Sequence, residues 1–237
     1  MPISTRDNAA RFTTRSAAVA GVALFGAAVA LVAPASAHAQ GTTTPATKPV
    51  IINGQVQDYG PLAQLIGTWE TVDPNGLDLA PGQAGTSVGA GGKAVSPFYE
   101  IITFKPSIPI TNDSVENVVA LSYDEAVYRR TNHHQFHDQI GYLIYNKQTN
   151  TVDNAFCLPR TVCVVAEGKA GKNKMTLTAT AAGIAQAPFM LAHDKTLGFS
   201  ITYDLSPNIL HFTEKTDLFV YGKPFSHVDS DTLHKIN

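Results

Sequence analysis

The sequence predicts an all-β fold, an antiparallel up-and-down β-barrel of about ten strands with a short N-terminal helical turn. The first observation is a period of two: Met, Leu and Ala alternate with Thr over 174–180, and 197–203 repeats the alternation. The second is that short β-forming segments follow one another at hairpin spacing, with no long amphipathic helix and no fixed internal repeat. Such chains fold as sandwiches or barrels, and a barrel of this strand number encloses a pocket for a small apolar ligand.

The elements are expected in the following order. A helical turn comes first, over 59–66, with Pro61 near its start. Residues 73–97 carry six glycines and three prolines and are expected to form a long flexible loop. The expected strands cover 67–72, 98–104, 117–130, 141–145, 151–157, 162–167, 174–180, 197–203, 209–214, 217–221 and 232–236.

The first 39 residues have the pattern of a signal peptide. Three arginines stand within the first 15 residues, and an Ala-rich apolar run follows over 17–33. Small residues then fit a signal-peptidase site, with cleavage after Ala37 or Ala39. An uncleaved membrane anchor is the alternative, although the run is short for spanning a bilayer. We therefore expect an exported protein, periplasmic or secreted, with no stable membrane span after the leader is cleaved.

Behind the leader, residues 40–58 are expected to be a flexible Thr/Pro-rich tether and 59–237 a single barrel domain. Cys157 and Cys163 flank a predicted turn between two strands. An oxidising compartment would permit a disulfide between them, and a buried thiol pair is the alternative.

Composition excludes several classes of function. Charged residues are 15% of the chain and apolar residues 44%, which is typical of a folded domain. The formal net charge is −2, so no basic excess exists to neutralise a phosphate backbone, and no nucleic-acid partner is expected. Two cysteines are too few for a disulfide scaffold or a four-cysteine zinc site. No Gly-x-Ser-x-Gly motif marks a serine nucleophile, and no catalytic residue is assigned.

Histidines are the residues that suggest chemistry. His133 and His137 have the i, i+4 spacing of zinc hydrolases, but the adjacent glutamate is missing, so we interpret His133 and His134 as part of a polar loop. His227 follows a strand, a glycine turn and a proline. A neutral imidazole pointing into an apolar cavity is what a five-coordinate haem needs, and Asp229 could accept its other ring N–H.

Four segments in order carry a family resemblance. They are 65–70 (Leu-Ile-Gly-Thr-Trp-Glu), 99–104, 136–142 (Phe-His-Asp-Gln-Ile-Gly-Tyr) and 225–233. Together they resemble the nitrobindin-like haem-binding β-barrel family, also catalogued as fatty-acid-binding-protein-like. The resemblance implies a ten-stranded barrel, ferric haem b held by His227, and chemistry on nitric oxide or peroxynitrite. Thr71 and Asp73 replace two glycines of the family's first strand.

Three functional interpretations follow. In the first, haem b is the cofactor, His227 is its metal ligand, and His137, Trp69 and Tyr142 contact it. In the second, the barrel carries a fatty acid or other lipid without haem, and Arg129, Arg130 or Tyr128 meets the carboxylate. In the third, a small enzyme acts on a hydrophobic substrate with His137 and Asp138 as an acid–base pair. Each interpretation expects a small hydrophobic partner in the interior.

Overall fold

The computed structural model describes residues 48–74, 76–109 and 115–237. The predicted signal peptide and the first part of the predicted tether lie outside the described residues. None of the described helices is long and apolar enough to cross a membrane.

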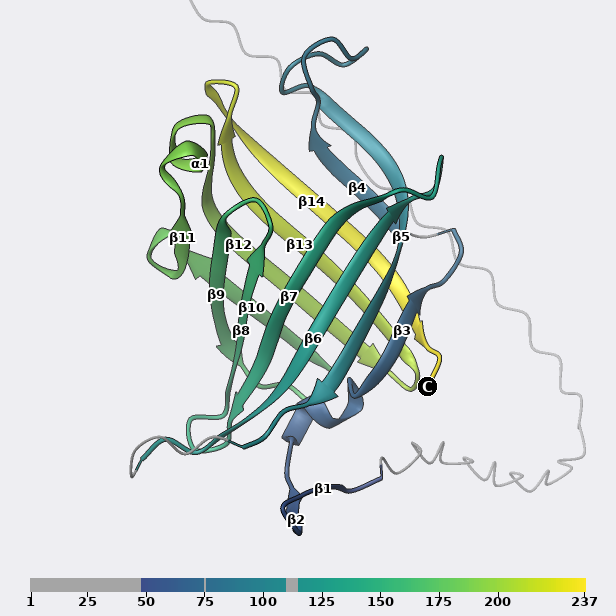
Figure 1. Cartoon of the computed structure of the whole chain (residues 1–237), viewed down its shortest axis with the longest axis vertical. Helices are drawn as coiled ribbons and strands as arrows, with labels where there is room; N and C mark the ends of the chain where they lie inside the picture. The colour runs from purple at the N-terminus through teal and green to yellow at the C-terminus, as the bar shows by residue number, and fades with distance from the viewer. Residues whose placement is uncertain (1–47, 75, 110–114) are drawn as a thin grey trace, which may run out of the picture. The chain divides into compact units, whose positions relative to one another are not determined.

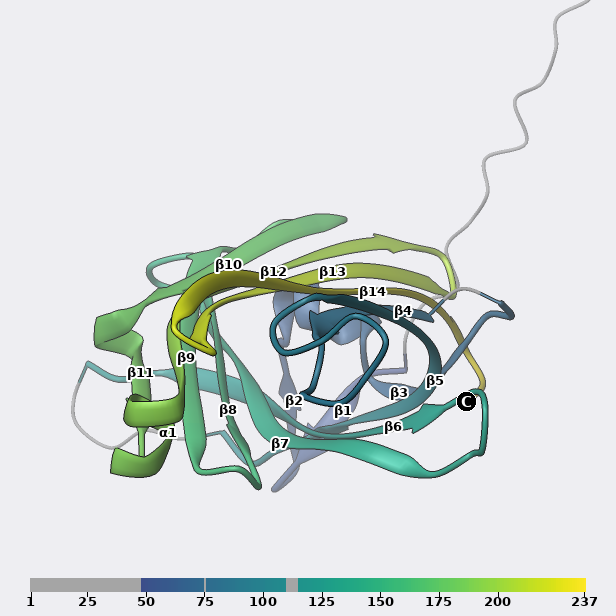
Figure 2. The ribbon, with the colours of Figure 1, turned by 90° about the horizontal axis from the view of Figure 1, so that it is seen from above.

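A closed antiparallel barrel confirms the predicted fold (Figure 1). Twelve strands form one sheet, in which β3 and β4 share a single position between β14 and β5, and the short β11 pairs with β9. Ten positions therefore surround the interior, and pairing between β9 and β10 closes the ring. Viewed from above, β10, β12, β13 and β14 lie on one side and β6, β7 and β8 on the other (Figure 2). The strands are β3 Gly67–Thr71, β4 Gly76–Pro81, β5 Lys93–Pro106, β6 Val118–Arg129, β7 Gln135–Asn146, β8 Thr151–Leu158, β9 Val162–Lys169, β10 Lys174–Thr180, β11 Ile184–Gln186, β12 Asp194–Ser206, β13 Ile209–Val220 and β14 Lys223–Lys235.

Several boundaries differ from the prediction. The expected loop 73–97 contains β4 and the start of β5, and only residues 82–92 connect the two strands. The glycine and prolines at 76, 81 and 97 lie within these paired strands and do not interrupt them. Residues 50–57, placed in the tether, form a hairpin of β1 (Val50–Ile52) and β2 (Gln55–Gln57). The two strands expected over 209–221 are one, β13. Strand β10 has the predicted bounds.

Short helical segments lie beside the strands. The predicted turn is the 3-10 helix η1 (Gly60–Gln64). A second 3-10 helix, η2 (Ala181–Gly183), and one short helix, α1 (Pro188–His193), were not predicted, because neither is long enough to show periodicity.

Cys157 and Cys163 stand opposite each other on β8 and β9 and form a disulfide with an S–S distance of 2.03 Å. The structure therefore has the bonded pair and not the buried thiols that the sequence left as the alternative.

A dry apolar core fills the end of the barrel next to η1. The side chains of Leu62 and Leu65 are fully buried there, and Trp69 donates from Nε1 to the backbone oxygen of Leu65 at 2.7 Å. Leu210 and Leu233, paired across β13 and β14, are also fully buried. Burying these side chains removes a large apolar area from water, which is the main favourable contribution to folding.

Further along β14, the inward-facing positions hold polar residues. Alternate residues of a strand share one face, so Asp231, Asp229 and His227 point to the same side as the buried Leu233. No register shift interrupts the pairing of β13 with β14, so the alternation holds along the whole strand.

Candidate ligand cavity

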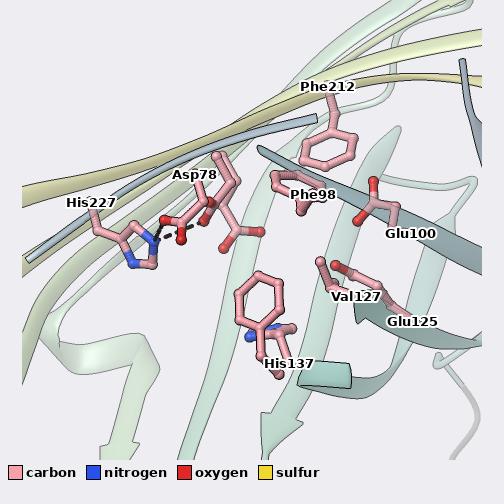
Figure 3. Close-up of a pocket in the computed structure, with 11 residues that line it drawn as sticks. Asp78, Phe98, Glu100, Glu125, Val127, His137, Phe212 and His227 are labelled. Carbon is pink, nitrogen blue, oxygen red and sulfur yellow. Dashed lines mark hydrogen bonds and ion pairs between the residues drawn. The ribbon is translucent and has the colours of Figure 1, made fainter. Parts of the chain in front are cut away.

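A cavity of about 60 Å³ lies inside the barrel, further from η1 than the apolar core (Figure 3). Side chains from β4, β5, β6, β7, β13 and β14 line it. They comprise five carboxylates, two imidazoles and four apolar groups, and none of these described lining residues is Lys or Arg. The lining residues are Asp78, Phe98, Glu100, Glu125, Val127, Phe136, His137, Phe212, Glu214, His227 and Asp229.

His227 is held between two carboxylates. Its Nε2 lies 3.0 Å from Asp78 Oδ1 and 3.2 Å from Asp229 Oδ2. Burial alone would lower the pKa of His227, but hydrogen bonds to Asp229 and Asp78 raise that pKa to about 10. The ring is therefore an imidazolium at neutral pH, with Nε2–H donating to the carboxylates.

Two of the lining acids, Glu100 and Glu125, form an acidic cluster with the neighbouring Asp231. Burial, followed by the nearby charge of Glu125, raises the pKa of Glu100 well above its usual value. Burial also raises the pKa of Glu125 to about 7 and that of Asp231 to about 6. Glu100 is only 1% exposed, and its Oε1 has no hydrogen-bond partner among the described residues. A buried acceptor without a partner is unusual in a folded protein and points to a missing contact.

Thr71 supports this cluster from β3. Its hydroxyl donates to Asp231 Oδ2 at 2.5 Å and accepts the backbone N–H of Glu100 at 2.7 Å. Thr71 on β3 therefore links Asp231 on β14 to the backbone of Glu100 on β5.

His137 reaches the cavity from β7, where a bulge displaces the pairing. Val127 pairs with His137 and the next residue, Tyr128, pairs with Gln135, so Phe136 has no partner on β6. Phe136 and His137 consequently both line the cavity, although they are consecutive. Burial lowers the pKa of His137, so its neutral form is favoured. His137 lies in a strand and not in the connection that the sequence suggested.

The other predicted cofactor contacts lie elsewhere. Trp69 is 1% exposed in the core beside η1 and does not line the cavity. Tyr142 is 49% exposed, because the alternation that turns Gly141 inward turns its neighbour outward. The structure thus brings His227 and His137 together and leaves Trp69 and Tyr142 outside the cavity.

Most of the side chains offered for the lipid and enzyme interpretations lie outside this cavity. Arg130 forms an ion pair with Asp73, and the guanidinium of Arg129 lies 4.3 Å from the ring centre of Phe136. Neither arginine lines the cavity, so a lipid carboxylate would meet carboxylates instead. Asp138 does not line this cavity, but it lines a neighbouring, more open hollow of about 470 Å³ together with His137.

Sequence reasoning missed Asp78, Glu100, Glu125 and Glu214. Asp78 fell in the expected loop. The three glutamates share a strand face with apolar residues, as Glu125 does with Tyr123 and Val127. A charged residue at an inward position of an alternating strand is a signal that could have found them.

Haem does not fit the site in this arrangement. The cavity itself is small beside the roughly 300–1,000 Å³ of pockets for drug-sized ligands, although a more open hollow of about 470 Å³ also has Phe136 and His137 in its lining. The nitrogen that would bind iron faces Asp78 and Asp229 at 3.0 and 3.2 Å, so these two carboxyl groups occupy the place that haem iron would need. The cavity also offers no described Lys or Arg for the carboxylates of a porphyrin, and burial raises the pKa of two of its five acids, Glu100 and Glu214, well above the usual value. We therefore derive no reaction step through haem.

A closed barrel with a lined interior cavity defines the class, which is that of the ligand-binding β-barrels. Residues 58–235 match the model of the THAP4-like, heme-binding beta-barrel domain family, and the chain belongs to this family. Among solved structures it is similar to the crystal structure of Rv2717c from M. tuberculosis, with a TM-score of 0.53 and 14% identity over 76% of this chain and 100% of that one. That likeness concerns the fold. A search of the curated proteins gave no match.

Proposed function

We propose that the protein is an exported binding protein whose barrel takes a small cationic ligand in the acidic cavity. The observation that carries this proposal is the lining: five acidic side chains face one partly open cavity to which no described Lys or Arg contributes. Low-dielectric walls focus the field of such a cluster and attract positive charge. The rings of Phe98 and Phe212 add faces on which a cation is stabilised.

The size of the cavity restricts the ligand. About 60 Å³ accommodates roughly four to six water-sized groups. His227 and Asp78 lie on one side of the cavity, with Glu100 and Glu125 on the other (Figure 3). A short organic diamine or a hydrated metal ion has the size and charge to lie between them.

Isothermal titration calorimetry of the full chain with putrescine and with Zn²⁺ tests the proposal. We expect at least one of these cations to saturate at one equivalent. The paired variant Glu125→Gln with Glu214→Gln should weaken binding of the diamine at least tenfold, while the outward-facing Glu167→Gln should not. Absence of saturable binding by either cation overturns the proposal.

Haem b with His227 as axial ligand is the second candidate, because the family is a haem-binding one. Haem binding would require His227 to lose its Nε2 proton and its contacts with Asp78 and Asp229. Reactions with nitric oxide or peroxynitrite would depend on the bound haem. Absorption titration with ferric haem tests this candidate. A Soret band that saturates at one equivalent and is lost in His227→Ala would favour haem over the cation.

Export is supported by the leader pattern of residues 1–39 and by the Cys157–Cys163 disulfide, a bond that persists in oxidising compartments. Mass spectrometry of the protein recovered from periplasmic and extracellular fractions should find an N-terminus at His38 or Gln40. An uncleaved chain in the membrane fraction would contradict export by cleavage.

A further inference from the structure

Three carboxylates form a row across neighbouring strands on the inner wall. Glu214 on β13 is the register partner of Asp229 on β14, and Asp229 is the register partner of Asp78 on β4. All three line the cavity. Like charges directly opposite one another in a sheet are destabilising, so either a proton on one of these acids or a positive charge beside the row relieves the repulsion.

His227 can carry one positive charge beside the three acidic side chains. Its ring nitrogen can also serve as a metal ligand. One ligand atom from each of Asp78, His227 and Asp229 lies within 4.8 Å of the others. The distances from Nε2 to the two carboxylates, 3.0 and 3.2 Å, resemble the ligand-to-ligand edges of roughly 3.0–3.5 Å that bond lengths of about 2.0–2.2 Å imply. The three atoms can therefore share one ion with little rearrangement.

A second observation points to a ligand in the same cavity. Glu100 lines the cavity from β5, is 1% exposed and has a carboxylate oxygen without a hydrogen-bond partner among the described residues. Glu100 lies across the cavity from His227 (Figure 3), so a water held in the cavity between the ion and Glu100 would give this oxygen a donor.

We propose that Asp78, His227 and Asp229 form a binding site for a divalent transition-metal ion such as Zn²⁺, with the neighbouring Glu214 as the third oxygen donor and fourth ligand. One imidazole nitrogen with carboxylate oxygens is a ligand set that suits zinc more than magnesium. Binding exchanges the proton on Nε2 for the metal, and that proton leaves to solvent. The inference rests on the proposed function, because it names the cation that the same cavity binds.

Zinc titration of the metal-free full chain tests the site, with Mg²⁺ as the comparison. We expect one Zn²⁺ per chain, and a loss of affinity of at least about 100-fold in Asp78→Asn and in His227→Gln, since even second-shell partners change metal affinity by about 10–100-fold. The paired variant His133→Gln with His134→Gln, in the exposed β6–β7 connection, is the matched control and should bind as the wild type does. Near-UV circular dichroism checks that each variant is folded.

Cobalt absorption gives a readout that needs no site variant. Co²⁺ bound to the wild-type chain should show a ligand-field band typical of nitrogen and oxygen ligands, displaced by one equivalent of Zn²⁺ and unchanged in the His133/His134 control. Binding of putrescine without Zn²⁺ or Co²⁺ would overturn the metal site and leave the proposed function standing. Zinc binding that persists in Asp78→Asn would mean an adventitious ion only. Binding of neither cation would overturn both proposals.

Discussion

The barrel interior is apolar at the end beside η1 and acidic further along the strands. Beside η1, Leu62, Leu65 and Trp69 pack into a core that excludes water. Further along the same strands, the inward positions hold Glu100, Glu125 and other acids around a cavity. Strand β14 joins both regions through one alternating face, from Leu233 to His227.

The comparison shows how stability and function are divided along the strands. The apolar end stabilises the barrel by burying area, and the acidic end costs stability because buried carboxylates are separated from water and crowd one another. Such a cost is tolerated where a site requires it. Changes at the apolar end should therefore alter unfolding, and changes at the acidic end should alter ligand and pH response.

Trp69→Ala should have the largest effect on stability. It removes a fully buried side chain and a hydrogen bond to Leu65, so the free energy of unfolding should fall by about 3–5 kcal/mol. Because the chain has a single tryptophan, urea unfolding is followed by circular dichroism and not by fluorescence. Cation binding by the folded variant should remain within about twofold of wild type. A tenfold change in binding would show that the two ends are not separate.

Stability should fall as the pH rises above about 5. Glu125 and Asp231 have folded pKa values of about 7 and 6, above their unfolded values, so they favour the folded state at low pH and lose that advantage as the pH rises towards 7. Besides burial, the charges of Asp229, Asp231 and Asp138 raise the pKa of Glu125, and a hydrogen bond with Glu100 lowers it.

The imidazolium of His227 acts in the same direction. Its folded pKa of about 10 lies above the unfolded value, so its contribution is complete below about 6.5 and is lost as the pH rises through 10. Thermal unfolding should show that the free energy of unfolding falls by roughly 3–5 kcal/mol between pH 5 and pH 7.5. Glu125→Gln should flatten that part of the profile, and a profile that rises over this range would refute the acidic-end account.

Thr71→Val should have the next largest effect. It removes the hydroxyl that binds Asp231 and the backbone N–H of Glu100, at the boundary between the two regions. Leaving buried groups without partners should cost about 1–2 kcal/mol and should raise the pKa of Asp231 further. Thr202→Val is the matched control, because its hydroxyl bonds only to the exposed Thr176 on the outer face. Equal losses in the two variants would contradict a buried role for Thr71.

The fold could be predicted because alternation is a local signal. Strand β10 was found with its observed bounds, since Met, Leu and Ala alternate with Thr. Strand β4 was missed because Gly76 and Pro81 form its ends, and such residues usually mark turns. Only pairing with β5 and β14 turns this segment into a strand, and pairing partners distant in the chain are not visible in a local pattern.

The site was predicted less completely for the same reason. His227 was found from its own neighbours, but the two carboxylates that hold it include Asp78, which lies 149 residues away in the chain. That contact changes the chemistry of His227 from a neutral iron ligand to an imidazolium. Residues near His227 in the sequence could not reveal its contact with Asp78. Strand alternation alone, however, could have placed Tyr142 on the outer face of the barrel.

Tyr142→Ala should give the smallest effect. A contact to a bound ligand would require Tyr142 to face inward, but in β7 it stands between Gly141 and Leu143 on the outer face, half exposed. Binding of putrescine, Zn²⁺ or haem should therefore change by less than twofold, and the free energy of unfolding by about 0.5 kcal/mol or less. His137→Gln, from the same strand but facing the cavity, should change cation binding several-fold. If Tyr142→Ala weakened binding as much as His137→Gln, the observed register of β7 would be wrong, and with it the placement of the acidic cavity.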